Sequence, residues 1–306
     1  MRIVFFGTPA FAVPSLRALL EEGFDVQAVV SQPDRPQGRS RSQLVPPPVK
    51  VAALEEGIPV LQPERPVGDF ATDLAALGAD LGVVVAYGHI LKPEILAIPR
   101  LGMINVHASL LPALRGAAPI QWAILNGNET TGVSIMQMEA GLDSGPVYHQ
   151  IETEVAADET GAELTERLAE LGAAALVEAL TVLEAGEARA TPQDHARATL
   201  APKVHRGHTR LDWGRDGATL ARVVRAFDPD PGAWALLDGQ EVKLFGGRVA
   251  NAGGDPGTVL TTGTTLQIAA QVGALEVCEV QPAGKKRMPV EAWVRGRGIA
   301  AGQRFT

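Results

Sequence analysis

Apolar residues in the first half of the chain form short continuous runs that alternate with stretches of helical periodicity. The runs predict strands over residues 1–6, 24–31, 58–61, 80–86 and 103–107. The periodic stretches predict helices, for example over residues 49–56 and 70–77. Alternating strands and helices are typical of a parallel sheet with right-handed crossovers. We therefore expect a Rossmann-like α/β domain with a parallel-rich sheet, extended by strands over residues 133–138 and 147–155.

A long amphipathic helix is expected to follow this sheet. Its leucines recur on one face between Asp158, the expected N-cap, and Gly186, which marks the expected end. Residues 189–203 contain few large apolar side chains and two prolines, Pro192 and Pro202. This composition predicts a linker. The expected domains are therefore residues 1–188 and residues 204–306.

The second domain has a different pattern, in which short apolar runs are separated by glycine and proline. These runs predict strands over residues 234–237, 241–245, 257–260, 265–270 and 275–280. Short strands that do not alternate with strong helices predict a small OB-like β-barrel domain. Barrels of this kind commonly bind nucleic acids.

Composition describes an ordinary globular protein, but the charge is unevenly distributed. The 306 residues are 46% hydrophobic and 20% charged, which allows two domains with a sizeable core in each. Residues 1–199 hold 13 Lys and Arg against 25 Asp and Glu, a net charge of −12. Residues 200–306 hold 14 against 10, a net charge of +4. A basic second half is expected where that half meets a polyanion, although a solvated basic face has the same composition.

Several classes of protein are disfavoured. One cysteine, Cys278, excludes an intramolecular disulfide, and the start of the chain does not resemble a signal peptide, so a cytoplasmic protein is expected. No apolar run approaches 18 residues, which argues against a membrane span. The histidines show no metal-ligand spacing, so no metal is expected. Gly7-Thr8-Pro9 lacks the glycine fingerprint of a nicotinamide-dependent dehydrogenase.

Candidate chemistry is concentrated in Asn105-Val106-His107 and in Asp143, which lies in Gly141-Leu-Asp-Ser-Gly145. On a strand, residues i and i+2 project to the same side, so Asn105 and His107 are expected to be neighbours. An amide beside an imidazole suits stabilisation of an oxyanion, and a carboxylate can orient the imidazole or keep it protonated. Each motif alone is more often structural. Together they predict acyl-group transfer without a covalent intermediate.

Other stretches complete this pattern: Phe6-Gly7-Thr8-Pro9, Gln32-Pro33-Asp34-Arg35-Pro36, Ala86-Tyr87-Gly88, Ser109-Leu110-Leu111-Pro112, Arg115-Gly116-Ala117-Ala118-Pro119-Ile120-Gln121 and Gln281-Pro282-Ala283-Gly284-Lys285-Lys286. With the Asn/His/Asp set, they resemble the 10-formyltetrahydrofolate-dependent formyltransferases over nearly the whole chain. The Asn/His/Asp set is common to the family, including its members that act on purine precursors and sugar amines. The stretches that begin at Gln32, Arg115 and Gln281 point to the branch that acts on aminoacylated tRNA.

The resemblance implies 10-formyltetrahydrofolate as formyl donor and initiator methionyl-tRNA as acceptor, without a metal, a membrane or an obligate protein partner. Asn105 and a protonated His107 would donate to the oxyanion, while Asp143 would take a proton and keep His107 charged. The folate site would be lined by Ser109, Leu110, Leu111 and Pro112. Phe11 would contact the methionyl side chain.

The resemblance also implies that the loop from Asp34 to Pro48 grips the acceptor end of the tRNA. The residues expected to contact tRNA are Arg35, Arg39, Arg41, Lys203, Lys285 and Lys286. The chain has Ser40-Arg41-Ser42 where the family often carries a lysine pair, so these contacts are expected to differ in detail.

Three other functions remain open. The chain could be a formyltransferase for a small amine, a formyl-folate hydrolase, or an RNA-binding protein built on a degenerate α/β domain. The basic loop and the basic second domain favour a tRNA acceptor over a small one. The presence of Asn105, His107 and Asp143 favours an enzyme over a binding protein.

Overall fold

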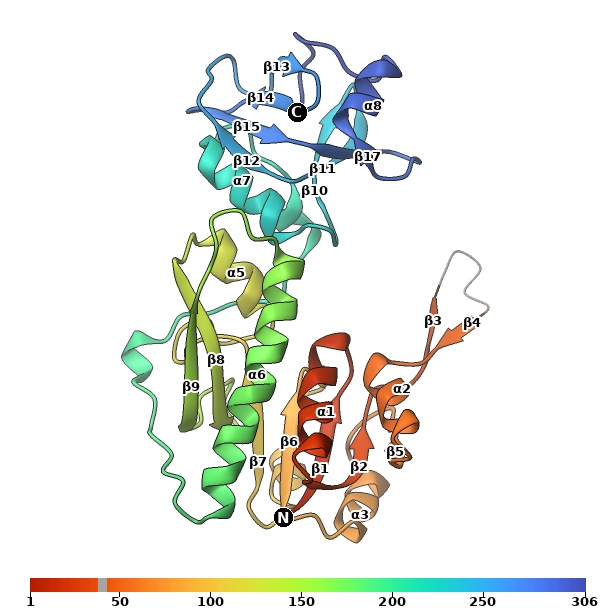
Figure 1. The fold of residues 1–306 in the computed structure, drawn as a ribbon, viewed down its shortest axis with the longest axis vertical. Coiled ribbons are helices and arrows are strands. Elements are labelled where there is room, and N and C mark those ends of the chain that lie inside the picture. Colours follow the sequence, from red (N-terminus) through yellow and green to blue (C-terminus); the bar gives the residue numbers. More distant parts are fainter. Residues whose placement is uncertain (38–42) are drawn as a thin grey trace. The chain divides into compact units, whose positions relative to one another are not determined.

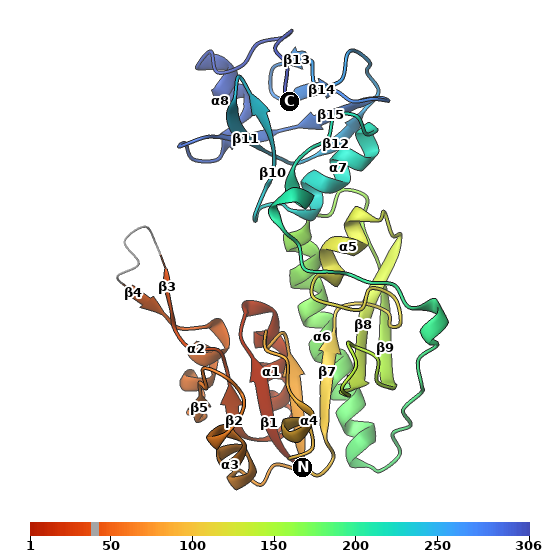
Figure 2. The ribbon, with the colours of Figure 1, turned by 180° about the vertical axis from the view of Figure 1, so that it is seen from behind.

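The chain folds into two compact units, shown from opposite sides in Figures 1 and 2. The structure is a computed structural model that describes residues 1–37 and 43–306. Unit 1 consists of residues 1–116, 131–153 and 165–201. Unit 2 consists of residues 117–130, 154–164 and 202–306.

Unit 1 is built on a seven-stranded sheet with the order β5-β2-β1-β6-β7-β8-β9. The strands are β1 (Arg2–Gly7), β2 (Asp25–Val30), β5 (Val60–Leu61), β6 (Leu81–Val85), β7 (Met103–His107), β8 (Thr130–Gln137) and β9 (Val147–Glu154). The strands from β5 to β7 are parallel, and β8 is antiparallel to β7. The expected parallel-rich α/β sheet is confirmed. The strand order reverses between β1 and β6, and ligands of open α/β sheets collect beside such a point, at the carboxyl ends of the strands.

Helices cover both faces of this sheet. They are α1 (Val13–Glu21), α2 (Pro48–Glu55), α3 (Asp69–Ala76), α4 (Pro93–Leu96) and α6 (Gly161–Glu184), and Figure 1 shows α1 and α6 on the near side. A short 3-10 helix precedes α1 at Ala10–Ala12. On β7, Met103 packs in one buried cluster with residues of α3 and α4. Val106 instead faces α6, because a Cβ added at Gly172 would lie 2.9 Å from Val106 Cγ1. Asn105 and His107 alternate with Val106, so both project toward the face that Met103 shares with α3 and α4.

The N-terminus of α6 differs from expectation. Asp158 is not the N-cap, since the helix begins at Gly161 and Thr160 caps it. The Thr160 hydroxyl accepts from the Glu163 backbone N–H at 3.3 Å, and the Glu163 carboxylate accepts from the Thr160 N–H at 2.9 Å. This reciprocal pair is a capping box. The expected end is confirmed, because Gly186 has a φ of +74° just after the last turn.

The segment expected to be a linker, residues 189–203, is hydrogen-bonded to unit 1 along much of its length. Thr191 exchanges backbone hydrogen bonds with Val147, at 2.8 Å in each direction. The Arg115 N–H donates to the Thr199 carbonyl at 2.9 Å, and the Ala201 N–H donates to the Arg115 carbonyl at 2.7 Å. A 3-10 helix, His195–Arg197, lies between these contacts. Unit 1 therefore extends to residue 201.

The expected loop from Asp34 to Pro48 contains a small hairpin. Its strands, β3 (Arg35–Gln37) and β4 (Gln43–Val45), pair with each other in antiparallel fashion as a separate two-stranded sheet. Arg35 is exposed on β3. Arg39 and Arg41 lie outside the described residues.

Unit 2 contains two four-stranded antiparallel sheets, which confirms the expected domain of short strands. One sheet has the order β10-β11-β16-β17 and the other β12-β15-β14-β13. The strands are β10 (Ala233–Leu237), β11 (Gln240–Phe245), β12 (Arg248–Ala250), β13 (Val259–Thr262), β14 (Leu266–Ala269), β15 (Ala274–Val277), β16 (Glu279–Pro282) and β17 (Met288–Pro289). The helices are α5 (Pro119–Leu125), α7 (Gly217–Ala226) and α8 (Val290–Arg295), with a 3-10 helix at Arg206–Thr209. One buried cluster that includes Trp213, Val224 and Phe305 forms the core.

The prediction of a single strand over residues 275–280 is wrong. The chain passes from one sheet to the other at Cys278, so β15 and β16 are separate strands with different partners. Hydrophobic periodicity cannot reveal this change, because the apolar residues on both sides point into the same core. Within the described ranges 1–37 and 43–306, no helix is long and apolar enough to cross a membrane.

Candidate active site

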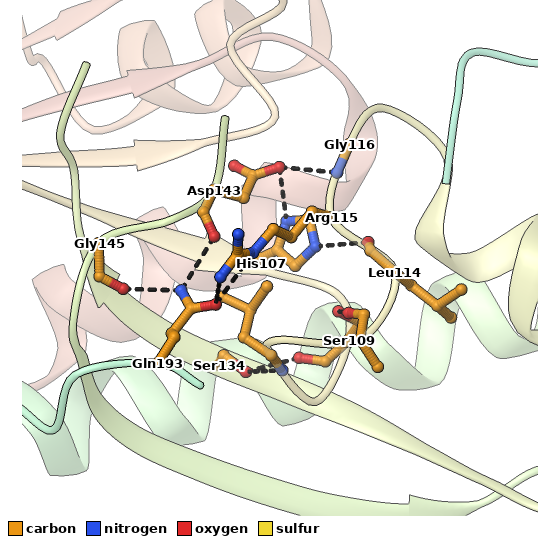
Figure 3. A network of polar contacts seen from close by, with 11 residues as sticks. His107, Ser109, Leu114, Arg115, Gly116, Ser134, Asp143, Gly145 and Gln193 are labelled. Atoms are coloured by element: carbon orange, nitrogen blue, oxygen red, sulfur yellow. Dashed lines mark hydrogen bonds and ion pairs between the residues drawn. The ribbon is translucent and has the colours of Figure 1, made fainter. Parts of the chain in front are cut away.

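Asn105 and His107 lie at the carboxyl end of β7, beside β6 and close to the point where the strand order reverses. In the antiparallel pairing with β8, Asn105 lies opposite Met136 and His107 opposite Ser134. The polar contacts around His107 all come from unit 1 and are drawn in Figure 3.

The imidazole of His107 is held in one orientation. Only 6% of the residue is exposed, and Nε2 lies 3.0 Å from the carbonyl oxygen of Leu114. A carbonyl oxygen can only accept a hydrogen bond, so Nε2 carries a proton and donates it. Nδ1 is then the ring atom on the other side, 3.8 Å from Oδ2 of Asp143. This nitrogen is the one available for chemistry.

Asp143 reaches His107 from the loop between β8 and β9, as Figure 3 shows. Its Oδ2 accepts a hydrogen bond from the backbone N–H of Gly116 at 2.8 Å. The loop has little room at its base, because a Cβ added at Gly145 would lie 2.0 Å from the carbonyl oxygen of Gln137. The structure thus brings together a carboxylate and an imidazole that are distant in sequence.

The side-chain amide of Asn105 is free. The residue is half-buried, and no group in the described part of the chain hydrogen-bonds to its side chain. An unpaired amide next to a fixed imidazole and a carboxylate is a donor that a ligand oxygen can use. The three expected residues therefore supply one free donor, one oriented nitrogen and one acceptor.

Burial lowers the pKa of His107, while the carboxylate of Asp143 and the hydrogen bond to Leu114 act in the opposite direction. The net direction is downward from the usual 6.5. This direction does not support the expectation that Asp143 keeps His107 charged before the reaction. The neutral ring, with its proton on Nε2, is the form that the free site favours.

A lowered histidine pKa makes the folded protein less stable in mild acid. As the pH falls below about 6.5, the unfolded chain protonates His107 while the native protein does not, so the free energy of unfolding decreases. The loss for one such group is at most about 1.4 kcal/mol per pH unit until the native pKa is reached. Relative to a His107→Gln variant, the wild type is expected to lose stability between pH 7 and pH 5 in urea unfolding. Parallel stability curves for the two proteins would contradict the assignment.

The residues expected to line a folate site form a tightly bonded turn after β7. The Ser109 hydroxyl donates to the Ala113 carbonyl at 2.6 Å, and the Ser134 hydroxyl donates to the Ser109 carbonyl at 2.6 Å. Ser134 also accepts from the Leu111 N–H at 3.0 Å. Ser109 and Leu111 are buried, whereas Leu110 and Pro112 are half-buried. Leu110 and Pro112 are therefore the side chains of this turn that retain exposed surface.

No sequence pattern predicts a role for Arg115, Gln193 or His195, which form a hydrogen-bonded network next to Asp143. Figure 3 shows Arg115 and Gln193 of this network. The Arg115 guanidinium donates to Gln193 and His195, and the Gln193 amide donates to the carbonyl of Asp143. Arg115 is the first residue of the stretch 115–121 that carries the family resemblance. Gln193 lies in the expected linker, where no periodicity marks it.

Within the described residues, none of those expected to contact tRNA hydrogen-bonds to this network. Arg35 is on the hairpin of unit 1, and Lys203, Lys285 and Lys286 are exposed in unit 2. Phe11, expected to contact the methionyl side chain, lies in the 3-10 helix before α1 and is half-buried. Among residues 1–37 and 43–306, no group of three or more His, Cys, Asp or Glu side chains could hold a metal ion.

The chain is similar to known families and proteins. The family described as formyl transferase matches residues 1–180, and the formyl transferase C-terminal domain matches residues 203–298. Methionyl-tRNA formyltransferase from Desulfotalea psychrophila is 48% identical over 305 residues, covering 98% of this chain and 94% of the relative. The enzyme of the same name from Paracoccus denitrificans is 48% identical over 304 residues, covering 98% of both chains.

Solved structures share the fold at low sequence identity. The sugar 3N-formyl transferase WlaRD superimposes with a TM-score of 0.69 at 16% identity, covering 94% of this chain and 99% of its own. HypX from Aquifex aeolicus, solved with tetrahydrofolic acid, has a TM-score of 0.67 at 22% identity and covers 97% of this chain and 47% of its own.

Proposed function

Because the chain belongs to the formyl transferase family, we propose that it transfers the formyl group of 10-formyltetrahydrofolate to the α-amino group of initiator methionyl-tRNA. The observation that carries this proposal is the full-length identity of 44–48% to methionyl-tRNA formyltransferases. The free Asn105 amide beside the His107–Asp143 pair supports the chemistry. Since translation starts in the cytoplasm, we place the protein there.

Asn105 stabilises the charge that develops in this reaction. When the amine attacks the formyl carbon, a carbon–nitrogen bond forms and the carbonyl oxygen becomes an oxyanion. The Asn105 Nδ2 has no competing partner among the described residues, so it can donate to that oxygen without losing an existing bond. Donors fixed before the reaction need no reorganisation as charge develops.

His107 and Asp143 handle the proton. The attacking amine must lose a proton, and N10 of the folate must gain one when its bond to the formyl carbon breaks. Nδ1 of His107 and Oδ2 of Asp143 are acceptors 3.8 Å apart, so together they can hold the proton between these events. A protonated Nδ1 also becomes a second donor to the oxyanion. His107 thus acquires its charge during the reaction rather than before it.

The folate is proposed to bind beside the turn that follows β7. A formyl oxygen needs a donor, and the unpaired Asn105 amide fits that need. The backbone of residues 109–112 is held rigidly by Ser109 and Ser134, and Leu110 and Pro112 retain exposed apolar surface for a flat ring system. We assign binding to the surface of this turn and not to the Ser109 hydroxyl, which is already engaged.

The acceptor can be tested by supplying formyl-labelled 10-formyltetrahydrofolate with methionyl-tRNA, free methionine, an amino sugar, or no acceptor. The proposal predicts acid-precipitable label with methionyl-tRNA and little label on either small amine. Preference for the amino sugar would favour a small-amine formyltransferase. Rapid release of formate without any acceptor would favour a hydrolase.

Lys285 and Lys286 are proposed phosphate contacts in unit 2. Both are exposed, and no carboxylate within the described residues pairs with either side chain, whereas the adjacent Arg287 pairs with Asp228 and Glu279. Replacing both lysines by glutamine is expected to weaken tRNA binding and to reduce the slope of log K against log salt by about two, one per contact. Fluorescence titrations at several salt concentrations measure this slope.

A matched control removes two positive charges from unit 1. Lys92→Gln with Arg100→Gln changes exposed side chains that pair only with Glu94 and Asp80, so the salt slope is expected to stay unchanged. An equal decrease in both double variants would indicate a general effect of net charge and would count against specific contacts at Lys285 and Lys286.

A further inference from the structure

Arg115 is a buried cation that no carboxylate neutralises within the described residues. Only 8% of the residue is exposed, and arginines at such burial are normally paired with an acid. Its Nε and Nη2 donate instead to Gln193 Oε1, at 3.1 and 2.6 Å. Nη2 also donates to His195 Nδ1 at 3.1 Å. Among the residues that the structure describes, the guanidinium therefore donates to the side chains of Gln193 and His195 and not to a carboxylate.

Gln193 connects this guanidinium to the loop that carries Asp143 (Figure 3). Because Oε1 is held by Arg115, the amide can have only one orientation, with Nε2 on the opposite side. Nε2 donates to the backbone carbonyls of Asp143, at 2.9 Å, and of Gly145, at 2.7 Å. Gln193 thus ties two points of the loop that flank Ser144.

The loop needs support, because Asp143 has a backbone φ of +44°. This left-handed conformation costs a residue with a side chain about 1–3 kcal/mol and persists only where neighbouring contacts impose it. The backbone on either side of Arg115 also supports the catalytic pair. The Leu114 carbonyl holds His107, and the Gly116 N–H holds the Asp143 carboxylate.

We propose that Arg115 and Gln193 form a clamp that positions Asp143 for proton transfer in the reaction assigned above. The inference rests on the proposed function and adds two positioning residues to it. Neither residue is required to touch a substrate. Arg115 fixes the orientation of Gln193, and the Gln193 amide holds the Asp143 loop in its left-handed conformation against His107.

The clamp is tested by removing the amide donor in two ways. Gln193→Leu deletes both hydrogen bonds to the loop, whereas Gln193→Glu keeps an acceptor for Arg115 but has no N–H to donate. Both variants are expected to lower kcat about tenfold to a hundredfold, as displacement of a reacting group by about 1 Å can do, with the KM of each substrate nearly unchanged. Amide hydrogen exchange at Gly116, whose N–H donates to the Asp143 carboxylate, is expected to become faster in both.

Asp194→Asn is the matched control. Asp194 follows Gln193 on the same segment, is exposed, and only caps the short 3-10 helix through the N–H of Ala196. Asparagine retains that acceptor, so both kcat and the exchange of the Gly116 amide are expected to equal the wild-type values. If the Gln193→Leu protein does not fold, the test rests on Gln193→Glu, because glutamate keeps an acceptor for the buried Arg115.

Failure of the clamp can be distinguished from failure of the proposed function. If the wild type formylates methionyl-tRNA and both Gln193 variants keep kcat within about twofold and exchange unchanged, the clamp is overturned. If the wild type does not transfer formyl groups, the proposed function fails, and hydrogen exchange alone then decides whether Gln193 holds the loop. Raised KM with unchanged kcat would also overturn the clamp, because it would place Gln193 in substrate binding.

Discussion

Asp143→Asn is expected to lower kcat for formyl transfer by about 10²–10⁴-fold, which is the range contributed by a positioned general acid or base. The change is nearly isosteric, and the new side-chain oxygen can still accept the hydrogen bond from the Gly116 N–H. It removes the negative charge that faces Nδ1 of His107 at 3.8 Å. The expected loss is therefore in the proton transfer and not in the fold.

Two measurements accompany the Asp143→Asn rates. Thermal unfolding and folate binding are expected to stay close to wild type, since the backbone of the loop keeps its contacts with Gln193. Retention of more than about a tenth of the wild-type kcat would contradict the role of the carboxylate. In that case Nδ1 of His107 alone would have to accept the proton from the amine.

Asn105→Ala is expected to lower kcat about 10²–10³-fold, or about 2.7–4 kcal/mol in transition-state stabilisation, as for one oxyanion donor. The structure also predicts that this loss costs little stability. The amide has no hydrogen-bond partner among residues 1–37 and 43–306, so its removal should leave the free energy of unfolding within about 0.5 kcal/mol.

Asn105→Asp is the companion variant, because it keeps the shape of the side chain but replaces the donor by an acceptor. It is expected to be at least as inactive as Asn105→Ala, since a carboxylate would repel the oxyanion. Steady-state kinetics with both substrates varied would separate kcat from KM. An effect confined to KM would place Asn105 in ground-state binding and contradict oxyanion stabilisation.

Local rules predicted the parts of the site that regular structure positions. The period of two along β7 placed Asn105 and His107 on one face, and the strand–helix alternation predicted the parallel sheet at whose edge they lie. The Thr160–Glu163 capping box was also readable, since a threonine followed three residues later by glutamate is its signature. The prediction of Asp158 as the N-cap was wrong because it did not take this pattern into account.

Other features depend on tertiary contacts that no local pattern encodes. Gln193 lies among polar residues without periodicity, and its role arises only because the chain returns to pack against Arg115. The lowered pKa of His107 follows from burial, and alternation along a strand does not indicate how deeply the face that carries His107 is buried. The β3–β4 hairpin is not predictable from hydrophobic alternation, because two three-residue strands are too short to show it.

We propose that the formyl group passes directly from folate to the amine of methionyl-tRNA at the Asn105–His107–Asp143 site. A rapid-quench single turnover with formyl-labelled 10-formyltetrahydrofolate and excess enzyme tests it most directly. Direct transfer predicts that label leaves the folate and appears on tRNA at the same rate, with none on protein, and that Asn105→Ala slows both events equally. Label that accumulates on the protein, or tRNA formylation that is unaffected in Asn105→Ala, would contradict it.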